Sequence, residues 1–377
     1  MPEINRRNIL TGAAAAAAMI GFPMVNFGQY RAHAQSPKRY SKRATDLVKG
    51  SLVIDMLGLI KLGRDDPPYY SKPLSDKDAA EFRASGITAF HVASGTRDYE
   101  STLVYMAGWQ GFAGRNGDVF TLVGRAEDID EAKRDGKCAV IMGIQNSEHF
   151  RTPADVKAFY QLGQRCSQLT YNSQNRIGAG STERVDGGVT DFGVEIIKAM
   201  NEVGMLIDVS HSGDRTTLDA IEISSKPIAF THSNCRALVN HPRVKTDEAI
   251  RALAKKGGVM GMTGVRNFVS ATEPTDVTHV VNHIDHAVKL VGIDHVGIGS
   301  DADLHGYDAM SPDQIARTKA NYKDSYAFRE KIDTDGFDHP LKMFDLTEEL
   351  IRRNYSDANI KAILGGNFRR LLGSTWL

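Results

Sequence analysis

The sequence has few cysteines and no net charge, and both shortages narrow the possible function. Only three cysteines, Cys138, Cys166 and Cys235, occur in 377 residues, and none belongs to a Cys-x-x-Cys pair. This count provides no disulfide framework and no cysteine zinc site, so we expect three buried core thiols. Lysine plus arginine and aspartate plus glutamate both total 46, so the chain lacks a general attraction for nucleic acid or anionic lipid. A small-molecule partner is therefore favoured.

A long hydrophobic run is also missing at the N-terminus, where the apolar stretch is too short and alanine-rich for a transmembrane helix. The pair Arg6-Arg7 precedes this stretch at 11–27, and the sequence Ala-His-Ala follows at 32–34. This order is typical of a twin-arginine export signal. The alternative, an amphipathic N-terminal helix, explains neither the arginine pair nor the cleavage pattern. We therefore expect residues 1–34 to be removed, leaving a periplasmic protein without a transmembrane anchor.

The remaining chain alternates short apolar runs with longer amphipathic stretches typical of helices. Continuous apolar runs fit strands that are buried on both faces, as in a parallel sheet. Eight such strands with helical crossovers predict an α/β protein with a closed (β/α)8 TIM barrel rather than an open doubly wound sheet. No Gly-x-Gly-x-x-Gly follows the first strand, which counts against a dinucleotide-binding domain. The predicted strands cover residues 51–57, 87–94, 138–145, 166–171, 204–210, 227–232, 257–264 and 295–301.

No internal repeat or long low-complexity linker divides the chain, so we expect one barrel domain over residues 35–377. Residues 302–340 are polar and irregular, which predicts a long loop insertion after the eighth strand. The loops that follow barrel strands surround the active site, so this insertion is expected to cover the pocket.

Polar side chains follow five of the predicted strands at their C-terminal ends, which meet at one mouth of a barrel. A lone histidine at such a position is more often a hydrogen-bonded structural residue than a ligand. Two histidines and an aspartate, however, form a donor set that zinc accepts, with a position left for water. Zinc lowers the pKa of that water toward ~7, which suits hydrolysis. The five residues are Gln145, Tyr171, His211, His232 and Asp301.

From about Ser51 onward the chain resembles the membrane (renal) dipeptidase family of the amidohydrolase superfamily. The resemblance rests on the segments Leu-Ile-Asp-Val-Ser-His at 206–211, Phe-Thr-His-Ser-Asn at 230–234, Gly-Ile-Gly-Ser-Asp at 297–301, Leu-Thr-Tyr-Asn at 169–172, Gly-Val-Thr-Asp-Phe-Gly at 188–193, Asn-His-Pro-Arg at 240–243 and Leu-Gly-Gly-Asn-Phe at 364–368. Family members hold two zinc ions and hydrolyse dipeptides, including some with a D-residue at the C-terminal side.

The resemblance assigns roles to four of this chain's residues. It implies that His211 and His232 bind one metal, and that Asp301 binds the other or handles the proton of the attacking water. It also implies that Arg243 faces the substrate carboxylate, where a guanidinium offers two parallel hydrogen bonds. Without the family context, a surface arginine beside Pro242 is the simpler interpretation.

Three departures from the family pattern predict a reduced site. Leu57 and Leu59 occupy the positions of a His-x-Asp pair that binds the first metal, and Gln145 replaces a bridging glutamate. Tyr171 stands where the family has a histidine that polarises the scissile carbonyl, and its hydroxyl can still donate one hydrogen bond. We therefore predict about one zinc ion per chain, on His211, His232 and Asp301. Gln145 is either a weak neutral ligand or a hydrogen-bond partner of a bound ligand. His91, on the second predicted strand, either packs in the core or points into the mouth.

Three functions remain open at this point. The leading hypothesis is an exported hydrolase that cleaves a dipeptide or similar small amide with a metal-activated water. The second is a metal-dependent lyase, isomerase or tailoring enzyme acting on an amino-acid-derived metabolite, because altered site residues accompany altered chemistry. The third is a non-catalytic binding protein on the same barrel. A homodimer remains an open alternative for the oligomeric state.

Overall fold

A computed structural model of the chain describes residues 40–59, 69–96 and 98–377. The expected export signal at 1–34 lies outside these residues. Tyr40–Leu377 form one compact unit. Among the helices that the structure describes, none combines the length and apolar character needed to cross a membrane.

Eight parallel strands close into a barrel, as the sequence predicts. Ring closure is explicit in the pairing, because β1 pairs with both β3 and β10, and β3 pairs with β5. All eight predicted strands are confirmed, although each hydrogen-bonded ladder is shorter than the apolar run that encodes it. The ring consists of β1 (Ile54–Asp55), β3 (Ala89–Ser94), β5 (Cys138–Ile144), β6 (Cys166–Gln168), β7 (Leu206–Asp208), β8 (Ala229–Ser233), β9 (Val259–Met262) and β10 (Val296–Ile298).

Three short strands were not predicted. β4 (Phe120–Leu122) pairs with the first half of β5, and β6 pairs with the last residues of β5 along the same edge. β2 (Gly58–Leu59) and β11 (Ala302–Asp303) form a separate two-stranded parallel ladder. Two or three residues are too few to show a periodic pattern, so these strands are visible only once their partners are known.

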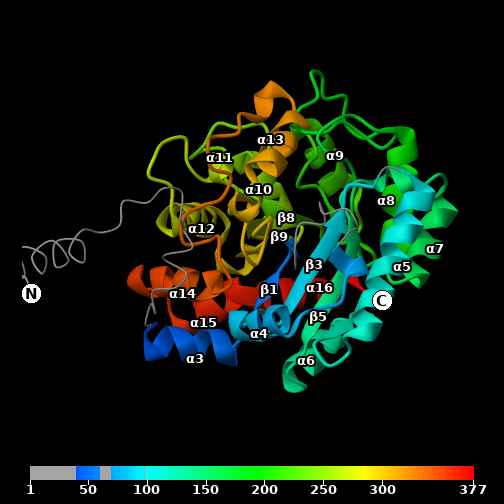
Figure 1. Cartoon of the computed structure of the whole chain (residues 1–377). Helices are drawn as coiled ribbons and strands as arrows, with labels where there is room; N and C mark the ends of the chain where they lie inside the picture. The colour runs from blue at the N-terminus through cyan, green and yellow to red at the C-terminus, as the bar shows by residue number, and fades with distance from the viewer. Residues whose placement is uncertain (1–39, 60–68, 97) are drawn as a thin grey trace, which may run out of the picture. The chain divides into compact units, whose positions relative to one another are not determined.

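Helices cover the outside of the ring (Figure 1), and α8 shows how the sequence sets their ends. Thr190 caps its start by accepting a hydrogen bond from the Gly193 amide, and Gly204 ends it with a φ of 80°. Between these residues, Ile196 and Met200 lie buried on one face. The outer helices are α4 (Asp76–Ser85), α5 (Tyr99–Arg115), α6 (Glu127–Arg134), α7 (Pro153–Gln161), α8 (Asp191–Val203), α9 (Asp214–Ile223), α10 (Asp247–Lys255) and α12 (Val277–Val291), with α3 (Lys42–Gly50), α14 (Lys342–Arg352) and α15 (Asp357–Lys361).

The C-terminal helix α16 (Asn367–Thr375) closes the N-terminal end of the barrel. The Asn367 side chain donates to the Val296 carbonyl at the start of β10, at 2.8 Å. The Trp376 indole donates to the Arg165 carbonyl just before β6, at 3.1 Å. Phe368 joins a buried cluster with inward-facing strand residues. Because this end is sealed, a ligand site has to lie at the opposite mouth, where the strands end.

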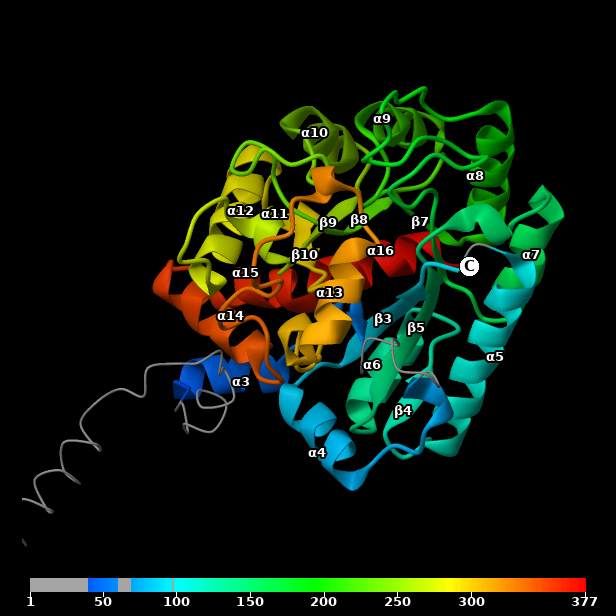
Figure 2. The same ribbon diagram turned by 45° about the horizontal axis from the view of Figure 1, so that its top comes forward.

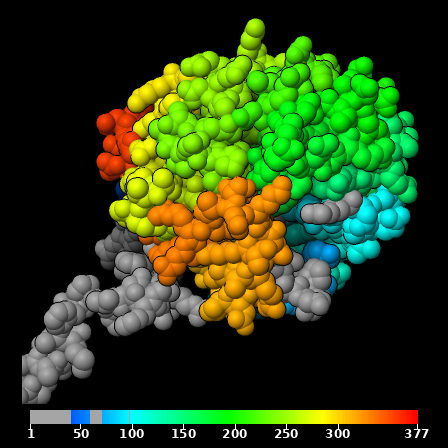
Figure 3. Space-filling view, turned by 90° about the horizontal axis from the view of Figure 1, so that it is seen from above, coloured from blue at the N-terminus to red at the C-terminus, as the bar shows by residue number. Residues whose placement is uncertain are grey.

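The segment from β11 to α14 forms a long excursion over that mouth. It contains η4 (Tyr307–Ala309), α13 (Pro312–Ala320) and η5 (Asp324–Tyr326). Figure 2 shows α13 in front of the strands, and Figure 3 shows the excursion's orange atoms across the face of the molecule beside the green loops. Tyr326 and Ile332 of the excursion pack with Phe268 in a separate buried cluster.

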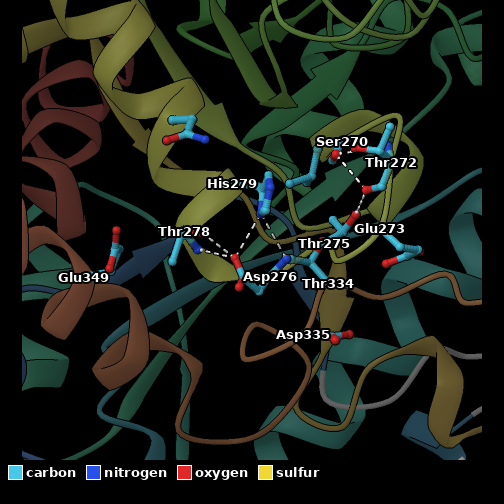
Figure 4. Close-up of polar contacts among 12 residues, drawn as sticks. Ser270, Thr272, Glu273, Thr275, Asp276, Thr278, His279, Thr334, Asp335 and Glu349 are labelled. Atoms are coloured by element: carbon cyan, nitrogen blue, oxygen red, sulfur yellow. Dashed lines mark hydrogen bonds and ion pairs between the residues drawn. The ribbon is translucent and has the colours of Figure 1, made fainter.

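Ion pairs fasten the end of the excursion to the loop that precedes α12 (Val277–Val291). Figure 4 draws Glu273 and Asp335, the acidic members of these pairs. Arg266, which is buried, pairs with Glu273 and Asp335, and Arg329 of the excursion pairs with the same Glu273. The Asp335 amide donates to the Thr275 carbonyl at 3.1 Å, which adds a backbone link to the same loop. The excursion is therefore held by charge, by backbone bonds and by its aromatic packing.

Candidate active site

Two histidines face each other at the mouth of the barrel. His232 lies on β8, and His211 lies three residues after β7, the neighbouring strand. Both side chains are buried, and their Nε2 atoms lie 3.0 Å apart. The structure thus brings together the two histidines that the strand-end argument predicted as a pair.

The outer nitrogen of each ring is held by a hydrogen-bond acceptor. His211 Nδ1 lies 2.7 Å from Asn172 Oδ1, so the ring donates its hydrogen there. His232 Nδ1 lies 2.8 Å from Thr231 Oγ1, whose own hydrogen goes to the Asp208 carboxylate at 2.6 Å. Since each Nδ1 carries the hydrogen, both Nε2 atoms present bare lone pairs to each other. This is the arrangement in which imidazoles bind a metal, with the second ring nitrogen oriented by an outer partner.

Asp208 orients the residues that hold His232 from outside, and the sequence argument did not single it out. Its Oδ1 accepts from the Ser210 amide, the Ser210 hydroxyl and the Thr231 amide, and its Oδ2 accepts the Thr231 hydroxyl. The available signal was an aspartate inside an apolar strand, because such a buried carboxylate must be fully hydrogen-bonded.

Burial keeps both imidazoles neutral. It lowers the pKa of His211 and that of His232 well below the usual range, and the positive charge of nearby Arg243 adds to the effect. Neutral imidazole is the form that binds a metal ion. A second cation, Lys245, lies close by, and burial followed by repulsion from Arg243 lowers its pKa to about 7.

Arg243 lies behind the two histidines and is fully buried, so it is not a surface arginine. Its guanidinium donates to the Ser210 carbonyl and, at 3.1 Å, to the His232 carbonyl. Its Nε has no hydrogen-bond partner among the residues that the structure describes. In this arrangement Arg243 ties together the backbones that carry the histidines. Its role toward a substrate carboxylate stays a prediction.

Tyr171 covers one histidine. Its ring stacks on His211, with centroids 4.2 Å apart and an interplanar angle of 19°. Its hydroxyl oxygen lies 2.9 Å from that of Tyr322, a residue of the excursion. Burial raises the pKa of Tyr171 well above its usual range, and Tyr322 adds to the shift. Tyr171 is therefore a neutral phenol that can donate a hydrogen bond.

Asp301 and Gln145 follow their strands at the same mouth, as predicted. Asp301 has a φ of 56°, its amide donates to the Leu57 carbonyl at 2.8 Å, and its carboxylate accepts from the Tyr307 hydroxyl at 3.4 Å. The half-buried Gln145 pairs through its backbone, with its amide on the Ser94 carbonyl. As metal ligands, both residues stay predictions.

The spacing of the two histidine nitrogens is compatible with a shared metal ion. Two nitrogen ligands of a tetrahedral zinc lie about 3.3 Å apart, so the 3.0 Å between the histidine nitrogens requires little movement. Over residues 40–59, 69–96 and 98–377, however, no group of three or more His, Cys, Asp or Glu side chains is arranged to hold a metal. Leu57, which the sequence comparison with the family places at a first-metal ligand position, is buried and offers no donor.

His91 lies inside the barrel and has one unused nitrogen. Its Nδ1 lies 2.8 Å from the Met56 carbonyl, while its buried Nε2 has no partner in the part of the chain that the structure describes. The ring occupies the space that Gly143 leaves, since a Cβ on that glycine would lie 1.8 Å from Nε2. His91 is thus a buried histidine in the barrel interior. That it points into the mouth stays a prediction.

Comparison with known proteins identifies the family. Residues 76–313 match the model of the membrane dipeptidases, peptidase family M19. The chain belongs to the membrane dipeptidase family. Dipeptidase VerJ of Clonostachys rogersoniana is 30% identical over 263 residues, which are 69% of this chain and 61% of that protein. The chain therefore spans about three-fifths of the length of that curated relative. A Klebsiella pneumoniae relative, described as an uncharacterized protein in the pqqA 5' region, is 34% identical over 189 residues. These residues are 47% of this chain and 70% of that protein.

Solved structures of similar proteins share the barrel. An amidohydrolase from Pseudomonas aeruginosa is 28% identical, with a TM-score of 0.77 over 88% of this chain and 99% of that one. The probable dipeptidase PvdM from the same organism is 20% identical, with a TM-score of 0.73 over 88% and 97% of the two chains. The second likeness supports the fold alone. Both agree with the (β/α)8 barrel predicted from the eight apolar runs.

Proposed function

We propose that the chain is an exported, metal-dependent hydrolase of the dipeptidase type that cleaves a dipeptide or similar small amide at a site with one metal ion. One observation carries the proposal. The Nε2 atoms of His211 and His232 face each other at 3.0 Å, and fixed acceptors hold both outer nitrogens. Two opposed lone pairs repel each other unless a cation lies near them. A metal ion between the two Nε2 atoms would therefore relieve the repulsion that Asn172 and Thr231 impose by holding the hydrogens on the outer nitrogens.

The residues around the pair suit amide hydrolysis. A bound zinc ion would supply an acidified water and polarise the carbonyl. Tyr171, which is neutral and stacked on His211, donates a hydrogen bond to the carbonyl oxygen as negative charge develops there. Asp301 accepts the proton of the attacking water, and Arg243 attracts the substrate carboxylate.

Metal content tests the proposal first. The mature protein is purified without chelators and its zinc is measured per chain, beside a His211→Ala/His232→Ala variant. A His286→Ala/His295→Ala variant is the matched control, because His286 bonds Asp247 between outer helices and His295 bonds Gly258 near the start of β10. We expect about one zinc ion in the wild type and the control, and none in the site variant. Absence of zinc from all three proteins after zinc is offered would refute the metal site.

Substrate screening tests the reaction. Zinc-loaded protein is incubated with dipeptides, including some with a C-terminal D-residue, and with other small amides and esters, and the products are weighed by mass spectrometry. Hydrolysis adds one water and gives two fragments. If nothing in the panel is cut, the hydrolase assignment is wrong.

A metal-dependent lyase, isomerase or tailoring enzyme is the second candidate. The neutral Gln145 and the Tyr171–Tyr322 hydroxyl pair favour it, because both place uncharged groups where the family uses ionisable ones. A product of unchanged mass would indicate isomerisation and support this candidate over hydrolysis.

A further inference from the structure

The hydroxyl pair at the mouth joins residues that are 151 positions apart. Tyr171 follows β6, and Tyr322 lies between α13 and η5 of the excursion. Their oxygens are 2.9 Å apart, a normal hydrogen-bond length. The excursion thus contacts Tyr171, the tyrosine that stacks on His211, through the hydroxyl oxygen of Tyr322.

Hydrogen counting gives the pair a direction. Two phenols carry two hydroxyl hydrogens, and one of these lies between the oxygens. The tyrosine that accepts keeps its own hydrogen for another partner, whereas the one that donates has none left. If Tyr171 donated to Tyr322, it would have no hydrogen for a bound carbonyl. If Tyr322 donates, the Tyr171 hydrogen is free, and the bond it receives makes it a stronger donor.

We propose that Tyr322 is a positioning residue: it donates to the Tyr171 oxygen and leaves the Tyr171 hydrogen for the carbonyl of the bound substrate. The inference rests on the proposed function, because it assigns Tyr171 a carbonyl to polarise. It adds a residue of the excursion to the machinery, acting through Tyr171 rather than on the substrate.

The surroundings of Tyr322 hold it in place for this role. Its ring lies 4.4 Å from that of Tyr326 and 5.2 Å from that of Phe328, measured between centroids. The next residue, Lys323, donates to the Thr182 carbonyl at 3.0 Å. Tyr326 is itself buried, and its carbonyl accepts from His241 at 2.9 Å. Aromatic contacts and side-chain hydrogen bonds thus hold the segment that follows Tyr322.

Kinetics of four variants test the inference: Tyr171→Phe, Tyr322→Phe, their double variant, and Phe328→Leu as a packing control. We expect Tyr171→Phe to lower kcat by about 10²-fold, as for loss of a carbonyl-polarising donor. Tyr322→Phe should lower kcat by about 3- to 10-fold, the effect of one hydrogen bond between neutral groups, with little change in KM. The double variant should match Tyr171→Phe, because Tyr322 acts only through Tyr171. Multiplying effects, or an equal loss in Phe328→Leu, would overturn the inference.

A readout independent of activity separates this inference from the proposed function. With 3-fluorotyrosine incorporated at position 171, the fluorine resonance should shift in Tyr322→Phe and stay in Phe328→Leu. An unchanged resonance in Tyr322→Phe would overturn the inference even in an active enzyme. If the wild type cleaves nothing, hydrolysis fails as the function. A phosphinate dipeptide mimic then serves as the probe: weaker binding to Tyr322→Phe supports the positioning role, and equal binding overturns it.

Discussion

Replacing Thr231 with valine removes the link between Asp208 and His232 at almost constant volume. The Thr231 hydroxyl accepts from His232 Nδ1 at 2.8 Å and donates to Asp208 Oδ2 at 2.6 Å. Valine has neither function, so the buried ring loses the acceptor that fixes its hydrogen on the outer nitrogen. Asp208 retains three bonds at Oδ1, from Ser210 and from the backbone of residue 231.

Two separate losses should follow from this change. Removing an outer partner of a metal-binding histidine typically costs 10- to 100-fold in metal affinity, about 1.4 to 2.7 kcal/mol. Leaving a buried polar group without a partner costs about 1 to 3 kcal/mol of unfolding free energy. Because the apo protein also lacks the bond, the second loss should be present without metal.

Zinc affinity is measured by competition with a chelating dye, and the free energy of unfolding of the apo protein by urea denaturation. Thr347→Val is the matched control, because Thr347 is equally buried but its hydroxyl donates only to the Met343 carbonyl within α14. Wild-type zinc affinity in Thr231→Val would refute the idea that this hydroxyl orients the ring. An equal loss of affinity in Thr347→Val would assign the effect to general destabilisation.

Three further predictions concern other parts of the chain. Burial raises the pKa of Asp338 to about 6, so its ionised form is disfavoured in the folded state and stability falls as the pH rises from about 4 to 6. Asp338→Asn should therefore raise the free energy of unfolding at pH 8 by at most about 3 kcal/mol and have no effect below pH 4; equal effects at both pH values would contradict this. Gly143→Ala places a Cβ 1.8 Å from His91 Nε2 and should lower the free energy of unfolding, measured by urea denaturation, by about 1 to 3 kcal/mol. Adding His91→Ala should recover most of this loss, and a double variant that shows the full loss would exclude the clash. Arg6→Lys/Arg7→Lys should leave uncleaved precursor in the cytoplasm on fractionation and immunoblotting, and normal export would disprove the twin-arginine assignment.

The barrel was predictable because each of its strands leaves a local signal. A strand buried on both faces needs a continuous apolar run, and eight such runs separated by helical stretches are compatible with a closed ring. β4 leaves a weaker signal, because it has three residues and pairs with half of β5. The ladder of β2 with β11 has two residues per strand, and residues 58 and 302 pair only because the ring brings them together.

The site was predictable only in part, for a related reason. His211 and His232 could be paired because both lie at the C-terminal ends of neighbouring parallel strands. The partner of the outer nitrogen of His211 lies on another loop, because Asn172 is 39 positions away in the sequence. The partner of His232 is its sequence neighbour Thr231, but only the fold shows that this hydroxyl meets the ring. Tyr322 was beyond reach, because it lies in an irregular segment with no periodicity and meets Tyr171 across 151 positions.

The positions that match the family pattern and those that depart from it lie on different strands, which is consistent with the proposed metal site on β7 and β8. The changed positions follow β1, β5 and β6, where Leu57, Gln145 and Tyr171 are all uncharged. The strands β7 and β8 keep both histidines, together with a carboxylate and a hydroxyl whose hydrogen bonds orient one of them. A barrel that only bound an uncharged ligand would need no such support behind two buried imidazoles. The two histidines that we propose to bind a metal therefore lie at β7 and β8, whereas uncharged side chains follow β1, β5 and β6.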